Sequence, residues 1–139
     1  KLEKGLENEK SFYDFKKRIQ NLSNNLRFLI KDLKRKNKVI HIYGASTKGN
    51  VSIQYSKLTK KEISYAADKN PLKWNRKTPG SNIPIISEKT SRSKKPDYYL
   101  VLPWHFKDSF IKREKKFLIN GGKLIFHLPK IEILSKNNI

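Results

Sequence analysis

The stretch IYGASTKGN, residues 42–50, combines residue types that could hold a phosphate group. Gly44 and Gly49 allow a tight turn and a close approach of the backbone to a ligand, while Ser46 adds a hydroxyl and Lys48 a positive charge. A glycine turn between a strand and a helix also gathers free backbone N–H groups at the positive end of the helix dipole. Neither the P-loop spacing nor the dinucleotide fingerprint G-x-G-x-x-G is present. The pattern therefore predicts an anion-binding turn without specifying a nucleotide.

Three further residues could contribute to a ligand site near this turn. Asp68 follows the apolar run 63–67, about 20 residues after the turn, where an acid can bind a ribose hydroxyl; an ordinary turn beginning at Asp68 is the alternative. Trp104 could stack on a base or a sugar ring, with core packing as the alternative. His105 could hydrogen-bond a ligand or transfer a proton near neutral pH, unless it is simply a surface residue.

The sequence contains no recognisable catalytic or metal-binding set. It has no cysteine, and its three histidines are far apart without ligand spacing. The motifs G-x-S-x-G and H-E-x-x-H are absent, and no adjacent pair of carboxylates suggests a general acid and a general base. A reaction cannot be assigned without such groups in defined roles. We therefore assign no catalytic residue and no metal ligand.

Alternating apolar segments predict a parallel α/β sheet that would position these residues. Residues 1–37 carry an apolar stripe at spacings of three and four, which predicts an amphipathic helix, and Ser11 with Asp14 suggests a capping box at its start. Near-continuous apolar runs predict buried strands, as parallel sheets require. The expected strands are 39–43, 63–67, 84–86, 97–102 and 123–128, and the further expected helices are 49–58 and 106–119.

The candidate residues all follow predicted strands. Parallel sheets bind ligands at the carboxyl ends of their strands, so the turn 44–50, Asp68 and the segment 103–105 are expected at one edge of the sheet. The loop 69–83 is long for a connection without secondary structure, and such loops are often functional. The tail 130–139 is expected to be frayed.

The composition narrows the classes of partner. The 139 residues suit one domain, and 32 Lys and Arg against 12 Asp and Glu give a net charge of +20. A basic chain attracts polyanions such as nucleic acids, anionic membranes or phosphate ligands. The lysines are spread without a dense block, and AT-rich coding bias also explains them. No apolar run approaches the ~18 residues that a membrane span needs. We expect a cytoplasmic protein without a membrane partner.

Four stretches, in this order, resemble one family. They are YGASTKGN (43–50), DKNPLKWNRKTPGSNIPI (68–85), DYYLVLPWHFKD (97–108) and FLINGGKLIFHLP (117–129). Together they look like the C-terminal domain of S-adenosylmethionine-dependent sugar C-methyltransferases, which methylate a keto-sugar linked to a nucleoside diphosphate. The resemblance implies a Rossmann-like three-layer domain over residues 38–129, preceded by the long helix.

The resemblance also implies the partners and the site residues. S-adenosylmethionine would bind a separate methyltransferase domain of the full-length chain, no cofactor would bind here, and this chain would be a detached C-terminal domain, inactive alone. A nucleoside-diphosphate sugar would contact the turn, the neighbouring loop and the strand-end residues. The residues carried over are Gly44, Ala45, Ser46, Lys48, Gly49, Asn50, Asp68, Lys73, Pro79, Gly80, Trp104 and His105.

Other functions remain open from the sequence. The charge, with aromatic residues beside lysines, is compatible with a nucleic-acid-binding module. A fragment of a nicotinamide-dependent oxidoreductase is a further alternative, although the dinucleotide fingerprint is missing. The remaining alternative is a purely structural domain that caps a partner domain.

Overall fold

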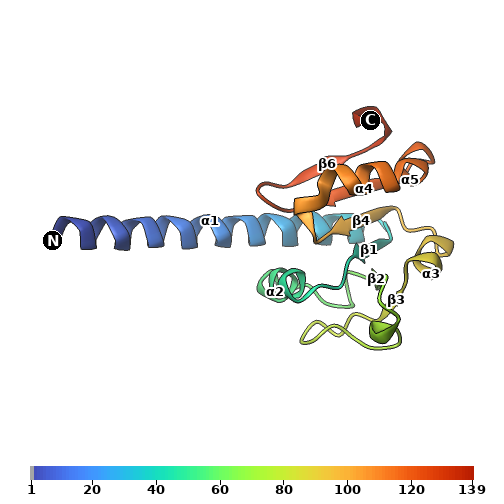
Figure 1. Cartoon of the computed structure of the whole chain (residues 1–139), viewed down its shortest axis with the longest axis horizontal. Coiled ribbons are helices and arrows are strands. Elements are labelled where there is room, and N and C mark those ends of the chain that lie inside the picture. Colours follow the sequence, from blue (N-terminus) through green and yellow to red (C-terminus); the bar gives the residue numbers. More distant parts are fainter. Residues whose placement is uncertain (1) are drawn as a thin grey trace.

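The computed structural model describes the backbone of residues 2–139 and the side chains of residues 8–139. A long helix precedes a six-stranded sheet that carries further helices (Figure 1). Lys1, part of the predicted leading helix, lies outside the described residues. The helices are α1 (Leu2–Arg35), α2 (Thr47–Tyr55), α3 (Glu88–Ser93), α4 (Lys107–Arg113) and α5 (Lys115–Ile119). The strands are β1 (Ile40–Tyr43), β2 (Tyr65–Asp68), β3 (Ile85–Ser87), β4 (Tyr98–Val101), β5 (Lys123–Phe126) and β6 (Glu132–Leu134).

Two apolar clusters, one on each face of the sheet, produce three layers. Leu26 and Ile30 of α1 and Ile53 of α2 pack on one face. Phe110 of α4 and Leu118 of α5 pack on the other. The central strands are buried on both faces, as near-continuous apolar runs require. The predicted three-layer α/β fold with a leading helix is therefore confirmed.

The strand order is β3-β2-β1-β4-β5-β6. The first five strands in the chain run parallel, and β6 is antiparallel to β5. From β1 the chain proceeds to β2 and β3 on one side, then returns to place β4 on the other side of β1. The order therefore reverses between β1 and β4, which is where ligands bind in open parallel sheets.

The expectation of a frayed tail over residues 130–139 is wrong. Residues Glu132–Leu134 form β6, which pairs with β5 and places Ile133 opposite Ile125. The Ser135 side chain then accepts a hydrogen bond from the Asn137 N–H, in a capping box with Asn138. The short alternation around Ile133 was too weak a pattern to predict a strand, but edge pairing satisfies the free backbone groups of β5.

Two helix predictions also differ from the structure. Ser11 lies inside α1 rather than at its start, so it and Asp14 form no capping box at a helix terminus. The expected helix over 106–119 is divided at Glu114, whose backbone leaves helical geometry (φ −99°, ψ 18°). Its side chain turns into the protein and meets Arg92.

Helix α3 was not predicted from the sequence. Its six residues, EKTSRS, carry no apolar stripe, and Ser91 is the residue that it buries. The Ser87 side chain caps its start by accepting a hydrogen bond from the Thr90 N–H. Among the described helices, none is both long enough and apolar enough to cross a membrane.

Candidate functional site

The candidate site lies at the carboxyl edge of the sheet, beside the reversal in strand order. The turn after β1 and the segment after β4 flank this position. They are in contact, because a Cβ atom added to Gly44 would lie 3.0 Å from the Pro103 side chain. Gly44 also has a φ of +90°, a conformation that favours glycine. The structure thus brings together the two strand ends that the sequence predicted at one edge.

Hydrogen bonds within the protein fix the shape of the turn. The Gly44 N–H donates to the Ala67 carbonyl at 2.8 Å, and Ser46 caps α2 by accepting from the Gly49 N–H at 3.0 Å. Thr47 and Lys48 form the exposed first turn of α2, where backbone N–H groups have no partner inside the helix. These donors and the Lys48 ammonium form the part of the turn that an anion could meet.

Asp68 ties the turn to the following loop. One carboxylate oxygen accepts from the Ala45 N–H at 2.9 Å, and the other accepts from the Asn70 N–H at 2.8 Å. Lys73 Nζ lies 3.5 Å from the first oxygen and donates to the Ala45 carbonyl at 2.9 Å. Both oxygens are therefore engaged within the protein. Asp68 therefore has a structural role in this turn, and a ribose hydroxyl would have to share its oxygens with these donors.

The loop 69–83 closes against α2. Asn50 Nδ2 and Gln54 Nε2 both donate to the Pro79 carbonyl, at 3.2 and 2.5 Å. Gly80 has a φ of +75°, and a Cβ there would lie 2.5 Å from Gln54 Nε2. These contacts bring Pro79 and Gly80 beside Asn50, and Lys73 beside Ala45. The predicted loop residues thus lie around the turn, where they shape it from one side.

Trp104 and His105 form the opposite side of this edge. Their ring centroids are 3.9 Å apart. Trp104 is half-buried and packs against the apolar cluster under α4 and α5, whereas His105 is exposed. Trp104 therefore packs against the core, as one interpretation of the sequence expected, and His105 is the more accessible of the two.

The turn is an exposed edge rather than the floor of a closed pocket. Gly44, Ala45, Ser46 and Asn50 are half-buried, and only Gly49 is fully buried. Two clefts of about 910 and about 850 Å³ lie elsewhere, between α1 and α2 and between α3 and α5, and neither is lined by a residue of the turn.

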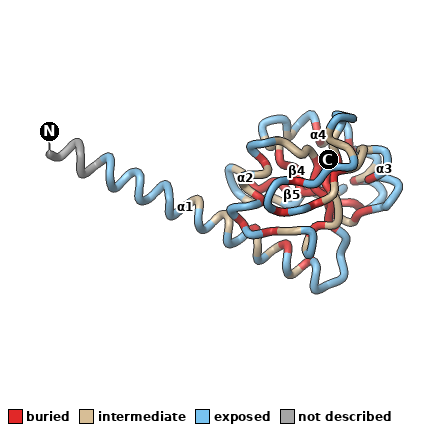
Figure 2. The backbone as a smooth tube through the Cα atoms, turned by 90° about the horizontal axis from the view of Figure 1, so that it is seen from below, coloured by how far each residue is buried: buried red, intermediate tan, exposed pale blue. Residues whose placement is uncertain are grey.

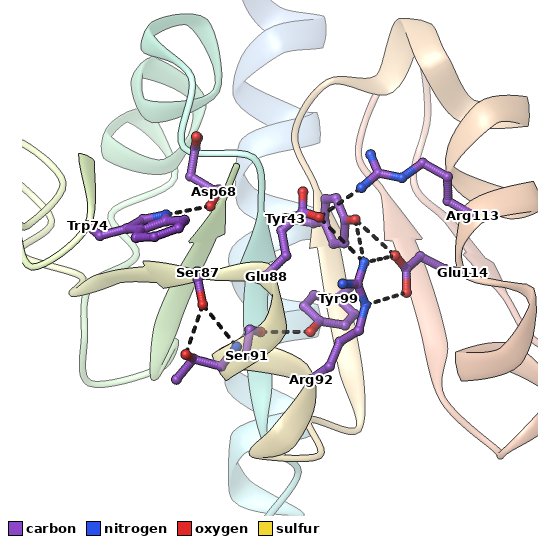
Figure 3. A network of polar contacts seen from close by, with 11 residues as sticks. Tyr43, Asp68, Trp74, Ser87, Glu88, Ser91, Arg92, Tyr99, Arg113 and Glu114 are labelled. Atoms are coloured by element: carbon purple, nitrogen blue, oxygen red, sulfur yellow. Dashed lines mark hydrogen bonds and ion pairs between the residues drawn. The ribbon is translucent and has the colours of Figure 1, made fainter. Parts of the chain in front are cut away.

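A largely buried polar network holds the side chain of Tyr43, the residue before the turn (Figure 3). The Tyr43 hydroxyl donates to Glu114 at 2.9 Å and accepts from Arg92 at 2.9 Å. Arg92 also donates to both oxygens of Glu114, at 2.5 and 3.3 Å. Burial and the Glu114 carboxylate raise the pKa of Tyr43, and the bond to Glu114 raises the pKa of Arg92. The network anchors the last residue of β1 to α3 and to the junction of α4 and α5.

The sequence reasoning missed this network because its members come from distant segments. Tyr43, Arg92 and Glu114 share no spacing that a motif could reveal. The available signals were a lone glutamate inside the predicted helix 106–119 and a polar strand end at Tyr43. Neither signal identifies a partner.

A second buried chain of hydrogen bonds involves His41. The ring Nδ1 lies 2.7 Å from the Ser91 hydroxyl, which lies 2.7 Å from the Tyr99 hydroxyl. Burial, with a smaller effect from Lys94, lowers the pKa of His41 from 6.5 to about 4. His41 is therefore a neutral hydrogen-bonding group in the interior, and its ring contacts Tyr99 edge-on, as the ring of Tyr43 does.

Comparison with known proteins identifies the family. Residues 2–129 match the family model described as the C-methyltransferase C-terminal domain. This chain belongs to that family. It is also 36% identical over 110 residues to the C-methyltransferase NovU of Streptomyces niveus. That match covers 79% of this chain but only 26% of the relative, so the chain spans about a quarter of the relative's length. The predicted relationship to a C-methyltransferase C-terminal domain is confirmed.

Gly49 tests how tightly the turn is packed. A Cβ at this position would lie 2.6 Å from the Leu102 Cβ, an atom fixed to the backbone. Gly49→Ala gains about 1 kcal/mol in helix propensity, but overpacking of this kind costs about 1–3 kcal/mol. We expect a net loss of about 1 kcal/mol in the free energy of unfolding, measured in urea. Val51→Ala, at an exposed position of α2, should change stability little, and an unchanged or more stable Gly49→Ala would contradict the packing argument.

Proposed function

We propose that this domain holds the nucleoside-diphosphate part of a keto-sugar that an S-adenosylmethionine-dependent C-methyltransferase methylates. The observation that carries the proposal is the turn 44–50 at the reversal of strand order, with the uncommitted donors of Thr47 and Lys48 at the start of α2. A helix start of this kind suits a diphosphate. Family membership supplies the methyltransferase context.

The roles of the residues follow from their contacts. The N–H groups at the start of α2 and the Lys48 ammonium would bind the diphosphate, while Asp68 and Lys73 hold the turn in shape. Trp104 and His105 lie across the edge, where an exposed face is suited to a base or a sugar ring. The methyl donor would bind a separate domain and supply the methyl group there, so the role of this chain is to bind and orient the substrate.

A nucleic-acid-binding module is the alternative. The net charge of +20 supports it, because polyanions bind basic surfaces with little regard to sequence. The two functions differ in their salt dependence. Binding to many spread lysines falls steeply with salt, whereas a diphosphate held by backbone donors at one turn loses less affinity.

The deciding experiment is an amide NMR titration with thymidine diphosphate, with single-stranded DNA in parallel, at low and physiological salt. We expect thymidine diphosphate to shift the signals of residues 44–50 and of the loop 68–80, and the shifts to persist in salt. If millimolar thymidine diphosphate moves no signal in the turn while DNA shifts signals across the lysine-rich surface, the proposed function is wrong.

Lys48 provides the matching substitution. Charged hydrogen bonds contribute about 1.5–3 kcal/mol, so Lys48→Ala should weaken thymidine diphosphate binding by roughly 10-fold or more. Lys61 is an exposed lysine before β2, at the opposite edge of the sheet, and Lys61→Ala should leave the affinity unchanged. Equal losses from both variants would indicate general charge attraction and would count against a site at the turn.

A further inference from the structure

Helix α1 extends well beyond the body of the domain (Figures 1 and 2). In the extended part, Phe12 is 71% exposed, Tyr13 65% and Phe15 56%. Aromatic side chains of this size contribute strongly to cores and interfaces when they are buried. Several of them side by side on one projecting helix form an apolar surface that no described residue covers.

Phe12 and Phe15 continue the face of α1 that the domain itself buries. Leu26, Ile30 and Leu33 pack on the sheet and are almost fully buried. Phe12, Phe15, Ile19 and Leu22 extend the same spacing of three and four toward the N-terminal end of α1. Residues so spaced share one face of a helix. One continuous stripe is therefore covered at one end and bare at the other.

A small cleft marks the place where the stripe enters the domain. It has a volume of about 160 Å³ and is lined by Ile19 and Leu22 of α1, by residues of α2, and by His127. His127 is only 6% exposed, and both of its ring nitrogens are closed off from solvent by the surrounding residues. The cleft is bounded mainly by apolar side chains, which an apolar group of a partner could contact.

The flank of the stripe is positively charged. A cleft of about 910 Å³ between α1 and α2 is lined by Lys16, Lys17, Arg27 and Lys57, with tyrosines and amides and with no carboxylate among its described lining residues. A second copy of this chain would bring like charges together at this surface, which is unfavourable. An apolar surface with an acidic rim is the complementary partner.

The comparisons indicate where such a partner lies. The family is a C-terminal domain, and the matched segment covers 26% of the relative's length. About three-quarters of that relative therefore lies outside the match. Helix α1 is the first element of this domain, and its stripe is the surface nearest to whatever precedes it (Figure 1).

We propose that the stripe of α1, the His127 cleft and the cationic flank form one docking surface for the preceding domain of the full-length methyltransferase. The preceding domain would cover Phe12 and Phe15 with apolar side chains and place acidic groups along Lys16 and Lys17. It would also place an apolar side chain in the cleft, which Ile19, Leu22 and Val51 help to line. The identity of that domain rests on the proposed function, whereas the surface itself does not.

Hydrogen exchange on the full-length protein and on the 139-residue chain tests the proposal directly. We expect the amides of residues 10–22 to exchange at least ~10-fold more slowly in the full-length protein, because local opening of α1 would then require the domains to separate. Equal exchange rates over residues 10–22 would overturn the proposal. A 139-residue chain that dimerises with the same protection would also overturn it in favour of a second copy.

Substitutions on opposite faces of α1 provide the control. Phe28 is 69% exposed, and at 100° per residue it lies roughly 150° around the helix from Phe12 and Phe15. Phe12→Ser with Phe15→Ser should abolish the added protection in the full-length protein, while Phe28→Ser should preserve it. Protection that survives Phe12→Ser with Phe15→Ser would contradict the assignment.

The outcomes for the two proposals are separable. Binding of thymidine diphosphate to the isolated chain should be unaffected by Phe12→Ser, because Phe12 is exposed and lines neither of the clefts that α1 shares with α2. Protection of α1 without nucleotide binding would leave the docking surface intact and remove the proposed substrate. Nucleotide binding without protection of α1 would support the proposed substrate and would contradict the docking surface.

Discussion

Arg92→Met is expected to lower the free energy of unfolding by about 3 kcal/mol. The Glu114 side chain is only 2% exposed, and Arg92 donates to both of its oxygens. Removing one partner of a buried pair leaves a charge without compensation, at a cost of about 3–5 kcal/mol. We expect the lower end of this range because the Arg92 side chain is 40% exposed and Tyr43 continues to donate to Glu114. Urea unfolding at neutral pH measures the loss.

Two further variants show whether the buried charge is the cause. The double variant Arg92→Met with Glu114→Leu removes both charges and should recover most of the lost stability, since apolar replacement of a whole buried pair is often nearly neutral. Arg113 pairs with Glu88 at 2.8 Å in a less buried setting, so Arg113→Met should cost at most about 1 kcal/mol. If the double variant is no more stable than Arg92→Met, the packing of the arginine stem rather than its charge explains the loss.

The Arg92 network matters to function through its position. Tyr43 is the residue before the Gly44 turn, and its ring packs edge-on against Tyr99 and Phe110 at centroid distances of 5.1 and 4.8 Å. Its hydroxyl is held by Arg92 and Glu114. A side chain fixed at both its ring and its hydroxyl restricts the end of β1. The turn therefore begins from a rigid strand, which favours a preorganised ligand site.

The elements around the turn could be predicted because their signals are local. The run from Val39 to Tyr43 is apolar on both faces, and the glycine at 44 ends it. Such runs identify buried parallel strands without knowledge of their neighbours. Once the strands were predicted, the common edge of Asp68 and Trp104 followed from general properties of parallel sheets. This reasoning predicted where the candidate residues lie in the sheet. It could not predict in which direction each side chain points.

The role of Asp68 shows the limit of that reasoning. Its spacing from the turn suited a ribose-binding acid as well as an ordinary turn. In the structure both oxygens accept hydrogen bonds from nearby N–H groups, and Lys73 approaches one of them. Which donors reach a carboxylate depends on how the loop 69–83 folds back, and that loop contains no periodic pattern. The hydrogen bonds of Asp68 therefore show its structural role in the turn, which the spacing in the sequence could not establish.

The features missed from the sequence depend on contacts between distant segments. Helix α3 has no apolar stripe and is stabilised by the Ser87 cap and by buried Ser91. Strand β6 forms because β5 offers it an edge. The burial of His127 depends on α1 and α2, whose residues line the same cleft. These features depend on tertiary packing, which the local preferences of a sequence segment do not specify.

The protein is expected to lose about 3 kcal/mol of stability through His41 as the pH falls from 7 to 4. Burial lowers the pKa of His41 from 6.5 in the unfolded chain to about 4 in the folded protein, and this difference corresponds to about 3 kcal/mol. Because the unfolded state binds the proton first, the contribution is complete above pH 6.5, decreases between pH 6.5 and 4, and is constant below. Burial also lowers the pKa of His127, which adds a loss of the same sign.

The comparison with His41→Phe isolates this contribution from the carboxylates, which titrate over the same acidic range. Phenylalanine can keep the edge-on ring contacts that His41 makes with Tyr65 and Tyr99, and Ser91 retains Tyr99 as a hydrogen-bond partner. We expect His41→Phe to be less stable than the wild type at pH 7, and the difference to shrink by about 3 kcal/mol by pH 4. Urea unfolding curves collected across this range measure it. A difference that stays constant with pH would mean that His41 accepts a proton in the folded state as readily as in the unfolded chain. The Ser91–His41 contact would then form with a charged ring rather than with the neutral one inferred from its burial.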